Sequence, residues 1–174
     1  MENRTYEKFL PTSACSVCKG ACCRSMGGSY SPSDFRAVCY ESIRSLLEEG
    51  KTSIDWWETF NPRYFIGKKL SEDPIIPVFY LRARNQGSSI VDPGVRGTCC
   101  HLGEDGCELD RKHMPLQCRT LKPGDAENPC MNDYDKMACV DEWRKHQDVL
   151  AALALEFDPT MFDSAHRCFM HEDH

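Results

Sequence analysis

The chain has 174 residues, of which 41% are hydrophobic, and its formal net charge at pH 7 is −6. This length fits one domain, and folding should bury about 70% of the surface that the unfolded chain exposes. The negative charge argues against nonspecific binding of nucleic acid, and no apolar run approaches the ~18 residues of a membrane span. We therefore expect a single domain over residues 1–174, with neither nucleic acid nor a membrane as a partner.

Cysteine is the most informative residue type in this chain, with twelve copies. The first eleven residues are polar and charged and lack the apolar core of a signal peptide. In a reducing compartment, clustered cysteines bind metals or catalyse reactions more often than they form crosslinks. We therefore expect a cytoplasmic protein with free thiols, and disulfides are the less favoured alternative.

The first predicted element after the opening cysteines is a helix. Ser31 is placed to cap it, Pro32 suits its first position, and Asp34 adds an acidic group to its first turn. Apolar residues then recur every three or four positions up to Leu47, and Gly50 ends the pattern. Cys39 lies on the apolar face of this predicted helix, where a free thiol behaves as a small core residue.

The middle of the chain is predicted to mix short elements. Residues 54–60, which include Trp56 and Trp57, predict a short helix that ends at Asn61 and Pro62. Residues 75–81 predict a strand, in which Pro77 indicates a sheet edge or an irregular position. A turn over residues 85–88 then predicts a return into a second strand over residues 89–92.

The longest predicted helix covers residues 133–157 and ends before Pro159. Cys139 and His146 share its apolar face with Trp143, so we interpret both as core residues, although a ligand role stays open. The remaining tail, residues 158–174, contains Cys168 and three histidines and either chelates a metal or frays.

The candidate metal ligands fall into two groups. The first holds Cys15 and Cys18, whose CxxC spacing lets two sulfurs converge on one ion, followed by the adjacent Cys22 and Cys23. Because adjacent side chains diverge, we expect these last two to serve two nearby centres or one multinuclear centre. The second group begins in a glycine-framed hairpin and completes a set of eight: Cys15, Cys18, Cys22, Cys23, Cys100, Cys107, Cys118 and Cys130.

The cysteine pattern resembles the YkgJ-type cysteine-cluster family, described as a zinc- or iron-chelating domain. The matching features are CxxCxxxCC over residues 15–23, the serine-proline-acid step over residues 31–34, and the cysteine hairpin over residues 100–107. Pro115, the Cys118-Arg119 pair and Cys130 match its later positions. The resemblance covers residues 15–130, with an unfamiliar insert between residues 50 and 97, and implies metal chelation without a settled reaction.

Three positions depart from the family pattern. Met114 replaces an arginine before Pro115, Asp110 stands where an aromatic residue is common, and Cys99 is an extra thiol. Arg111 or Lys112 are the candidates to replace the missing arginine.

The spacing of the ligands slightly favours iron–sulfur over zinc. Zinc ribbons usually present two CxxC knuckles and this chain has one, whereas iron–sulfur proteins often combine a tight run with a remote cysteine near proline. A 4Fe–4S cluster or Zn²⁺ on the eight cysteines is therefore the expected cofactor. His101 and His113 could replace or orient a thiol, and Cys118 beside Arg119 could be an activated thiolate, although ligation explains Cys118 better.

These observations predict an α+β, helix-rich domain with a small β-hairpin and much irregular structure around a cysteine metal site. The expected function is that of a cytoplasmic metal-chelating protein with a redox or metal-dependent accessory role. Two alternatives stay open. One is a zinc-stabilised module that binds a protein partner, for example through Trp56 and Trp57. The other is an enzyme that uses a thiolate or an open metal position, for which the sequence offers no acid–base set.

Overall fold

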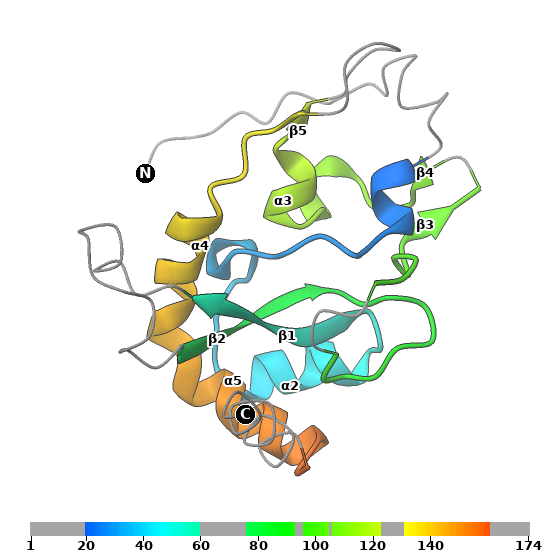
Figure 1. Ribbon diagram of the computed structural model, residues 1–174. Coiled ribbons are helices and arrows are strands. Elements are labelled where there is room, and N and C mark those ends of the chain that lie inside the picture. The colour runs from blue at the N-terminus through cyan, green and yellow to red at the C-terminus, as the bar shows by residue number, and fades with distance from the viewer. Residues whose placement is uncertain (1–19, 60–75, 93–95, 105, 123–130, 161–174) are drawn as a thin grey trace, which may run out of the picture.

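The structure is a computed structural model that describes residues 20–59, 76–92, 96–104, 106–122 and 131–160. Helices and two-stranded antiparallel sheets both occur in this part of the chain, so the predicted mixed α+β class is confirmed (Figure 1). Four of the predicted ligands or chelators, Cys15, Cys18, Cys130 and Cys168, lie outside the described residues, as do the tail histidines.

The central element is an antiparallel hairpin of β1 (Thr52–Thr59) and β2 (Ile76–Ala83), in which Ile54 faces Leu81 and Trp57 faces Val78. The strand predicted over residues 75–81 is therefore confirmed. The short helix predicted over residues 54–60 is wrong, because this segment is β1. Its β-branched and aromatic side chains suit a pleated, covered surface, and pairing with β2 satisfies its backbone.

Both edges of the hairpin are covered by single passes of chain. On the β2 side, the Tyr30 N–H donates to the Leu81 carbonyl at 2.8 Å and the Ala83 N–H donates to the Gly28 carbonyl at 2.9 Å. On the β1 side, the Ile54 N–H donates to the Ile90 carbonyl at 2.8 Å. The strand predicted over residues 89–92 is thus reduced to one parallel bridge, and its partner is β1.

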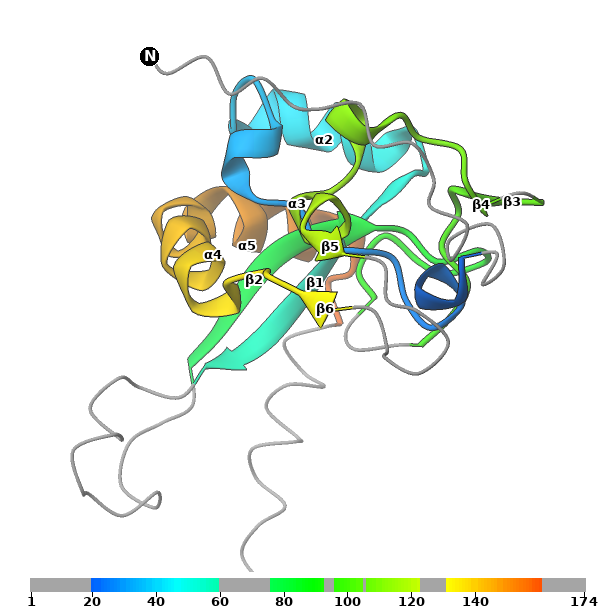
Figure 2. The ribbon, with the colours of Figure 1, turned by 90° about the horizontal axis from the view of Figure 1, so that it is seen from above.

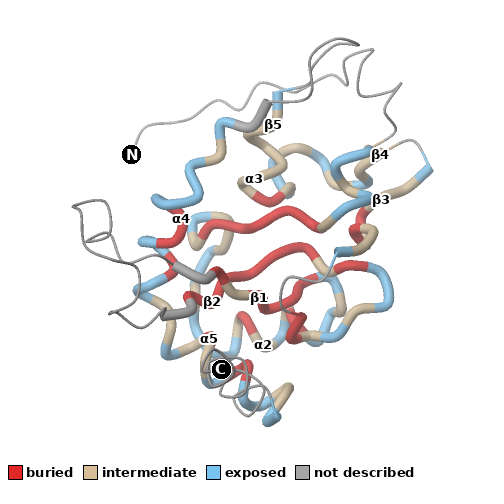
Figure 3. The backbone as a smooth tube through the Cα atoms, viewed as in Figure 1, coloured by how far each residue is buried: buried red, intermediate tan, exposed pale blue. Residues whose placement is uncertain are grey.

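Three helices pack against the hairpin. Helix α2 (Tyr40–Glu48) contacts β1 and α5, while α4 (Lys136–Trp143) and α5 (Gln147–Phe157) contact β2. Figure 1 shows α2 and α5 on one side of the hairpin, and Figure 3 shows that residues in the separate pass beside β2 are buried as well. The core residues with no exposed surface include Ile43, Leu47, Ile54, Leu81, Val140, Trp143, Leu150 and Leu153.

The helix predicted from Ser31 to Gly50 is divided in the structure. Ser31 does cap a helical turn, and the Asp34 carboxylate accepts a hydrogen bond from the Ser31 N–H, but the turn ends after Pro32–Asp34. The chain is extended at Phe35, whose ring packs 5.2 Å from that of Tyr30, and α2 begins only at Tyr40. Cys39 therefore stands at an exposed N-cap position, so its assignment to the core is wrong.

The long helix predicted over residues 133–157 is also divided, into α4 and α5 with a 3₁₀ turn at Arg144–His146. Gln147 explains the break, because its side-chain amide accepts from the Phe79 N–H at 2.8 Å and donates to the Phe79 carbonyl at 2.9 Å. Cys139 is buried as predicted, whereas His146 is only half-buried. The indole of Trp143 donates to the Tyr30 carbonyl at 2.8 Å and joins α4 to the pass beside β2.

Four very short strands and one short helix complete the described fold. The predicted cysteine hairpin is confirmed as β3 (Leu102–Gly103) with β4 (Gly106–Cys107). Helix α3 (Leu116–Arg119) follows, and β5 (Leu121–Lys122) pairs with β6 (Met131–Asn132). None of the helices in the described ranges combines the length and apolarity needed to cross a membrane.

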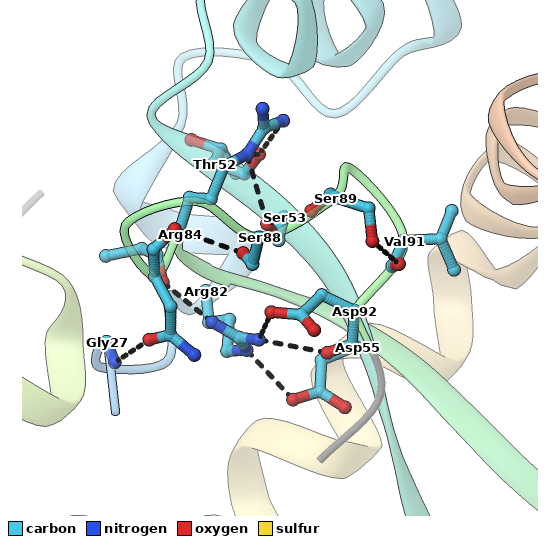
Figure 4. A network of polar contacts seen from close by, with 12 residues as sticks. Gly27, Thr52, Ser53, Asp55, Arg82, Arg84, Ser88, Ser89, Val91 and Asp92 are labelled. Atoms are coloured by element: carbon cyan, nitrogen blue, oxygen red, sulfur yellow. Dashed lines mark hydrogen bonds and ion pairs between the residues drawn. The ribbon is translucent and has the colours of Figure 1, made fainter. Parts of the chain in front are cut away.

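A buried ion network lies at the base of the hairpin. Arg82 is fully buried, donates to the Asp55 carboxylate at 2.9 Å and forms a second ion pair with Asp92 (Figure 4). Tyr80 donates to the same Asp55 oxygen at 3.0 Å. Because buried charges are tolerated only when they are paired and hydrogen-bonded, this network fixes the relative positions of β1, β2 and the pass at Asp92.

Candidate metal centre

The described cysteines of the predicted set come from three separate segments that lie on the side of the hairpin away from α2 and α5 (Figures 1 and 2). Cys22 and Cys23 lie in a 3₁₀ turn at Ala21–Arg24, Cys100 and Cys107 lie before and within the β3–β4 hairpin, and Cys118 lies in α3. The eight cysteines in the described residues carry free thiols.

The adjacent Cys22 and Cys23 point their sulfurs to the same side. Their Sγ atoms are 3.9 Å apart. Two thiolates bound to one tetrahedral zinc ion at about 2.3 Å would be separated by about 3.8 Å. The expectation that these adjacent side chains diverge is therefore wrong, and their spacing fits two ligands of a single ion.

The Cys22–Cys23 turn is attached to the segment that carries the later cysteines. The Cys99 N–H donates to the Cys23 carbonyl at 2.7 Å, and the Gly97 N–H donates to the Ser25 carbonyl at 3.0 Å. Gly20, with φ of +74°, packs so closely on Leu102 that an added Cβ would lie 2.6 Å from its Cδ1 atom. The first turn therefore rests directly on the β3–β4 hairpin that holds Cys107.

Cys118 is seated against a glycine. Its sulfur accepts a hydrogen bond from the Gly28 N–H, and a Cβ at Gly28 would overlap that sulfur. The preceding residue strengthens the contact, because the Gln117 N–H donates to the Ser29 carbonyl at 3.2 Å and the Gln117 side chain accepts from the Ser29 N–H at 2.8 Å. The sulfur of Cys118 is thus fixed relative to the pass that runs beside β2.

Asp34 ties the same two segments together with its carboxylate. One oxygen accepts from the Ser31 N–H at 3.0 Å and from the Leu116 N–H at 2.9 Å, and the other forms an ion pair with Arg119. The Asp34 side chain is only 4% exposed. The serine-proline-acid step and the cysteine-arginine pair, 85 positions apart, therefore form one structural unit.

Arg119 does not make Cys118 an activated thiolate. Its guanidinium is bonded to Asp34 and, at 2.5 Å, to the Met114 carbonyl. Burial raises the pKa of the Cys118 thiol to about 12 in spite of the neighbouring cation. Arg111, a candidate for the missing arginine, donates to the Arg119 carbonyl at 2.6 Å, whereas Lys112 is 68% exposed.

The adjacent cysteine pairs each contain one thiol that ionises readily. A hydrogen bond from Cys23 lowers the pKa of Cys22 to about 6, and the pKa of Cys23 is raised in turn. Hydrogen bonds from Cys99 and then His101 lower the pKa of Cys100 to about 4, while that of Cys99 is raised. Thiolates are the form that binds metals, so each pair offers one ready ligand and one that must release a proton.

The structure leaves the predicted centre incomplete. Cys15, Cys18 and Cys130 lie outside the described residues. Within the described ranges, no group of three cysteine, histidine or acidic side chains is close enough to hold an ion on its own. His101 is buried beside Cys100, whereas His113 is exposed and pairs with Asp110 at 2.9 Å, away from the thiols.

Sequence reasoning missed the structural roles of Asp34, Gly28 and Cys99. Asp34 was expected only to start a helix, and nothing in the sequence links it to a cysteine segment 82 positions later. A signal for Cys99 was present, because Cys99 and Cys100 repeat the adjacent pairing of Cys22 and Cys23. Trp57, which the interaction-module alternative would place on a docking surface, is buried and stacks on Tyr80 with ring centroids 3.7 Å apart.

Comparison of the chain with protein-family models, with curated proteins and with solved structures gives no match.

Proposed function

We propose that this protein chelates a thiophilic metal, as an iron–sulfur cluster or as zinc, through the cysteines of its two sequence groups. The observation that carries the proposal is that three segments carrying free cysteines lie on the same side of the hairpin, with the Cys22 and Cys23 sulfurs 3.9 Å apart. A collection of free thiols is a donor set that suits zinc and iron–sulfur clusters.

The ligand set in this proposal is Cys15, Cys18, Cys22, Cys23, Cys100, Cys107, Cys118 and Cys130. The five described members come from the segments that Asp34, Gly28 and the Cys23–Cys99 backbone bond hold together. The other three are assigned from the sequence, through the CxxC spacing of the first two and the resemblance to the cysteine-cluster family. When bound, the metal would supply either electron transfer or a structural link between these segments.

The spacing of Cys22 and Cys23 bears on which metal is bound. A distance of 3.9 Å fits two thiolates on the same tetrahedral ion, so it favours zinc or a site in which one iron takes both sulfurs. A 4Fe–4S cluster with one of these cysteines on each of two irons would need them farther apart. The sequence spacing of the cysteines favours an iron–sulfur cluster, whereas the Cys22–Cys23 distance favours one ion that takes both sulfurs. Analysis of the bound metal distinguishes an iron–sulfur cluster from zinc.

A redox or metal-dependent accessory role in the cytoplasm follows from the same donors. Free thiols persist in a reducing compartment. A metal centre close to the protein surface can exchange electrons or a metal ion with a partner. The alternative of an interaction module that docks through Trp56 and Trp57 loses support, because Trp57 is buried and Trp56 packs against the core.

The test is metal analysis of the full chain purified without oxygen. We expect stoichiometric iron with acid-labile sulfide and brown visible absorbance for a cluster, or stoichiometric zinc in a colourless protein. Cys22→Ser and Cys107→Ser should each lose bound metal, whereas Cys39→Ser, at the exposed N-cap of α2, should keep it. Wild-type protein that retains neither iron nor zinc, or both ligand variants with full metal content, would overturn the proposal.

A further inference from the structure

Cys22 and Cys23 form a pair of adjacent thiols that solvent can reach. Both thiols are free, and Cys22 is exposed whereas Cys23 is half-buried. One of the two sulfurs donates a hydrogen bond to the other over 3.9 Å. A small solute can therefore approach the Cys22 sulfur, and the Cys23 thiol stands beside it.

The two sulfurs are near enough to form a bond with each other. A disulfide joins sulfurs at about 2.05 Å, so the Cys22 and Cys23 sulfurs would have to approach by about 1.9 Å. Adjacent Cα atoms are about 3.8 Å apart, whereas disulfides usually join residues whose Cα atoms are about 4.4–6.8 Å apart. A bond between neighbouring residues is therefore strained, and strained disulfides are the ones that thiol reductants open readily.

We propose that Cys22–Cys23 is an oxidation site, which a peroxide converts to a reversible vicinal disulfide. The exposed Cys22 sulfur attacks one oxygen of hydrogen peroxide, the O–O bond breaks, and a sulfenic acid forms while the other oxygen leaves as water. The Cys23 sulfur then attacks the Cys22 sulfur, the S–O bond breaks, and the hydroxide leaves as water with the Cys23 proton. The two thiols give up two electrons and two protons, and the peroxide ends as two molecules of water.

The inference rests on the proposed function, in which both sulfurs are metal ligands, and it adds a means of regulating that site. A sulfur in a disulfide is no longer a thiolate, so closure of the pair removes two donors at once. Closure also twists the peptide between the two residues, whose N–H donates to the Gly20 carbonyl at 2.9 Å and whose carbonyl accepts from the Ser25 hydroxyl at 2.9 Å. Peroxide would therefore release metal from the turn at Ala21–Arg24, and a thiol reductant would restore the site.

Exposure alone is a second explanation for the reaction of a thiol with peroxide, and Cys39 is the matched control. Cys39 is also exposed, and its sulfur lies 3.2 Å from the Ser42 hydroxyl, which cannot form a disulfide. Oxidation of Cys39 should therefore stop at a sulfenic acid that dimedone traps, whereas Cys23 should consume the sulfenic acid of Cys22. Cys139, at 2% exposed, should stay reduced.

The test treats the metal-free full chain with hydrogen peroxide until Cys39 reacts, blocks the remaining thiols with iodoacetamide and digests the protein with trypsin. Cleavage after Lys19 and Arg24 releases residues 20–24, which contain both cysteines of the pair. We expect this peptide to lack two hydrogens and to carry no alkyl group, and dithiothreitol should make both thiols available again. In Cys23→Ala, dimedone should instead trap Cys22.

Three results of this experiment would overturn the inference and leave the proposed function intact. The first is a Cys22–Cys23 pair that stays reduced while Cys39 reacts. The second is a dimedone adduct as the main product at Cys22 of the wild type. The third is a disulfide that joins Cys22 to a residue other than Cys23.

Anaerobic Co²⁺ titration of the reduced and oxidised chains tests the effect on the metal site. Loss of an outer-shell partner alone weakens metal binding by about 10–100-fold, so loss of two ligands should weaken Co²⁺ binding by about 100-fold or more. Dithiothreitol, removed before the titration, should restore the affinity. Equal affinity of the reduced and oxidised chains would overturn the inference. A reduced chain without sulfur-to-cobalt charge-transfer absorbance would overturn the proposed function, and with it the role of the disulfide in metal release.

Discussion

At the scale of single residues, the structure concentrates charge in one buried place. Arg82 is fully enclosed, and its guanidinium is satisfied by Asp55, by Asp92 and by the Ala83 carbonyl at 3.1 Å. Removal of Arg82 would leave both Asp55 and Asp92 buried without the cation that compensates them. The network therefore contributes to stability mainly because loss of the cation that both carboxylates share is costly.

Replacement of the central cation tests this. Arg82→Met should lower the free energy of unfolding by about 3–5 kcal/mol, because Asp55 and Asp92 would stay buried without the cation that compensates their charge. Urea unfolding followed by circular dichroism measures the change. Arg44→Met is the control, since Arg44 pairs with Glu48 and Glu156 at the surface and should change stability far less. Equal effects of the two variants would contradict the buried-network account.

The thiols of the metal-free protein should differ in reactivity with pH. Hydrogen bonds from neighbouring thiols lower the pKa of Cys100 to about 4 and that of Cys22 to about 6, whereas burial raises that of Cys118 to about 12. Because only the thiolate is alkylated, Cys22 should react with iodoacetamide increasingly from pH 5 to pH 7, and Cys100 should already be reactive at pH 5.

Peptide mass analysis of briefly alkylated, metal-free protein measures these rates. Cys139, whose pKa burial raises to about 11, is the internal control and should stay slow over the whole range. Cys118 should stay slow below pH 9 for the same reason. Reaction of Cys118 before Cys22 at pH 7 would contradict this assignment of the ionised thiols.

At the scale of elements, Asp34 joins the 3₁₀ turn at Pro32–Asp34 to α3. Asp34→Asn keeps the shape of the side chain but removes the charge that pairs with Arg119, and it leaves the Arg119 cation poorly compensated. We expect a loss of about 2–4 kcal/mol in unfolding free energy and weaker metal binding, because the Cys118 segment loses one of its attachments. Chemical unfolding and Co²⁺ titration measure the two effects.

The control for this change is Asp133→Asn. Asp133, which directly follows β6, forms an ion pair with Lys122 of β5. Because the Asp133 side chain is 51% exposed, its charge contributes little to stability. The Asp133 variant should bind Co²⁺ like the wild type. An Asp34→Asn variant that matches it in stability and metal affinity would show that the carboxylate does not position Cys118.

Sequence patterns predicted well the elements that depend on neighbouring residues, and predicted poorly the elements whose limits depend on contacts with distant residues. The β3–β4 hairpin, the β2 strand and the Ser31 cap follow from glycines, β-branched residues and capping chemistry within a few positions. The two long helices were divided by contacts that no periodicity contains, namely Asp34 with Leu116 and Gln147 with Phe79. Likewise, β1 became a strand because β2 was available to pair with it.

At the scale of the whole molecule, most of the core lies between the hairpin and the helices, and it also includes Cys99 from the cysteine segments. The hydrophobic layer between the hairpin and helices α2, α4 and α5 contains fully buried residues such as Ile43, Leu81 and Trp143. The cysteine segments are held mainly by backbone hydrogen bonds and the Asp34–Arg119 pair. The candidate site was therefore predictable as a set of thiols, but its attachment to the hairpin was not.

Removal of metal should loosen one side of the molecule and not unfold all of it. With free metal at about 100 times its dissociation constant, chelation should lower the unfolding free energy by about 3 kcal/mol. Hydrogen exchange should accelerate in residues 20–31, 97–107 and 115–119, while α2, α4 and α5 stay protected. Uniform acceleration of exchange across the hairpin and helices would contradict this division. Cys39→Ser is the control variant and should respond to the chelator like the wild type.

The hydrogen bond from the Trp143 indole to Tyr30 gives the molecule a natural optical reporter. The carbonyl that accepts this bond lies in the same short pass whose Gly28 seats Cys118. A shift of Cys118 on metal binding would be transmitted from Gly28 to the Tyr30 carbonyl, and so to the Trp143 indole, through residues 28–30 of the backbone. Emission from Trp143, isolated as the difference between the wild type and Trp143→Phe, should therefore shift as the cysteine cluster is filled and emptied.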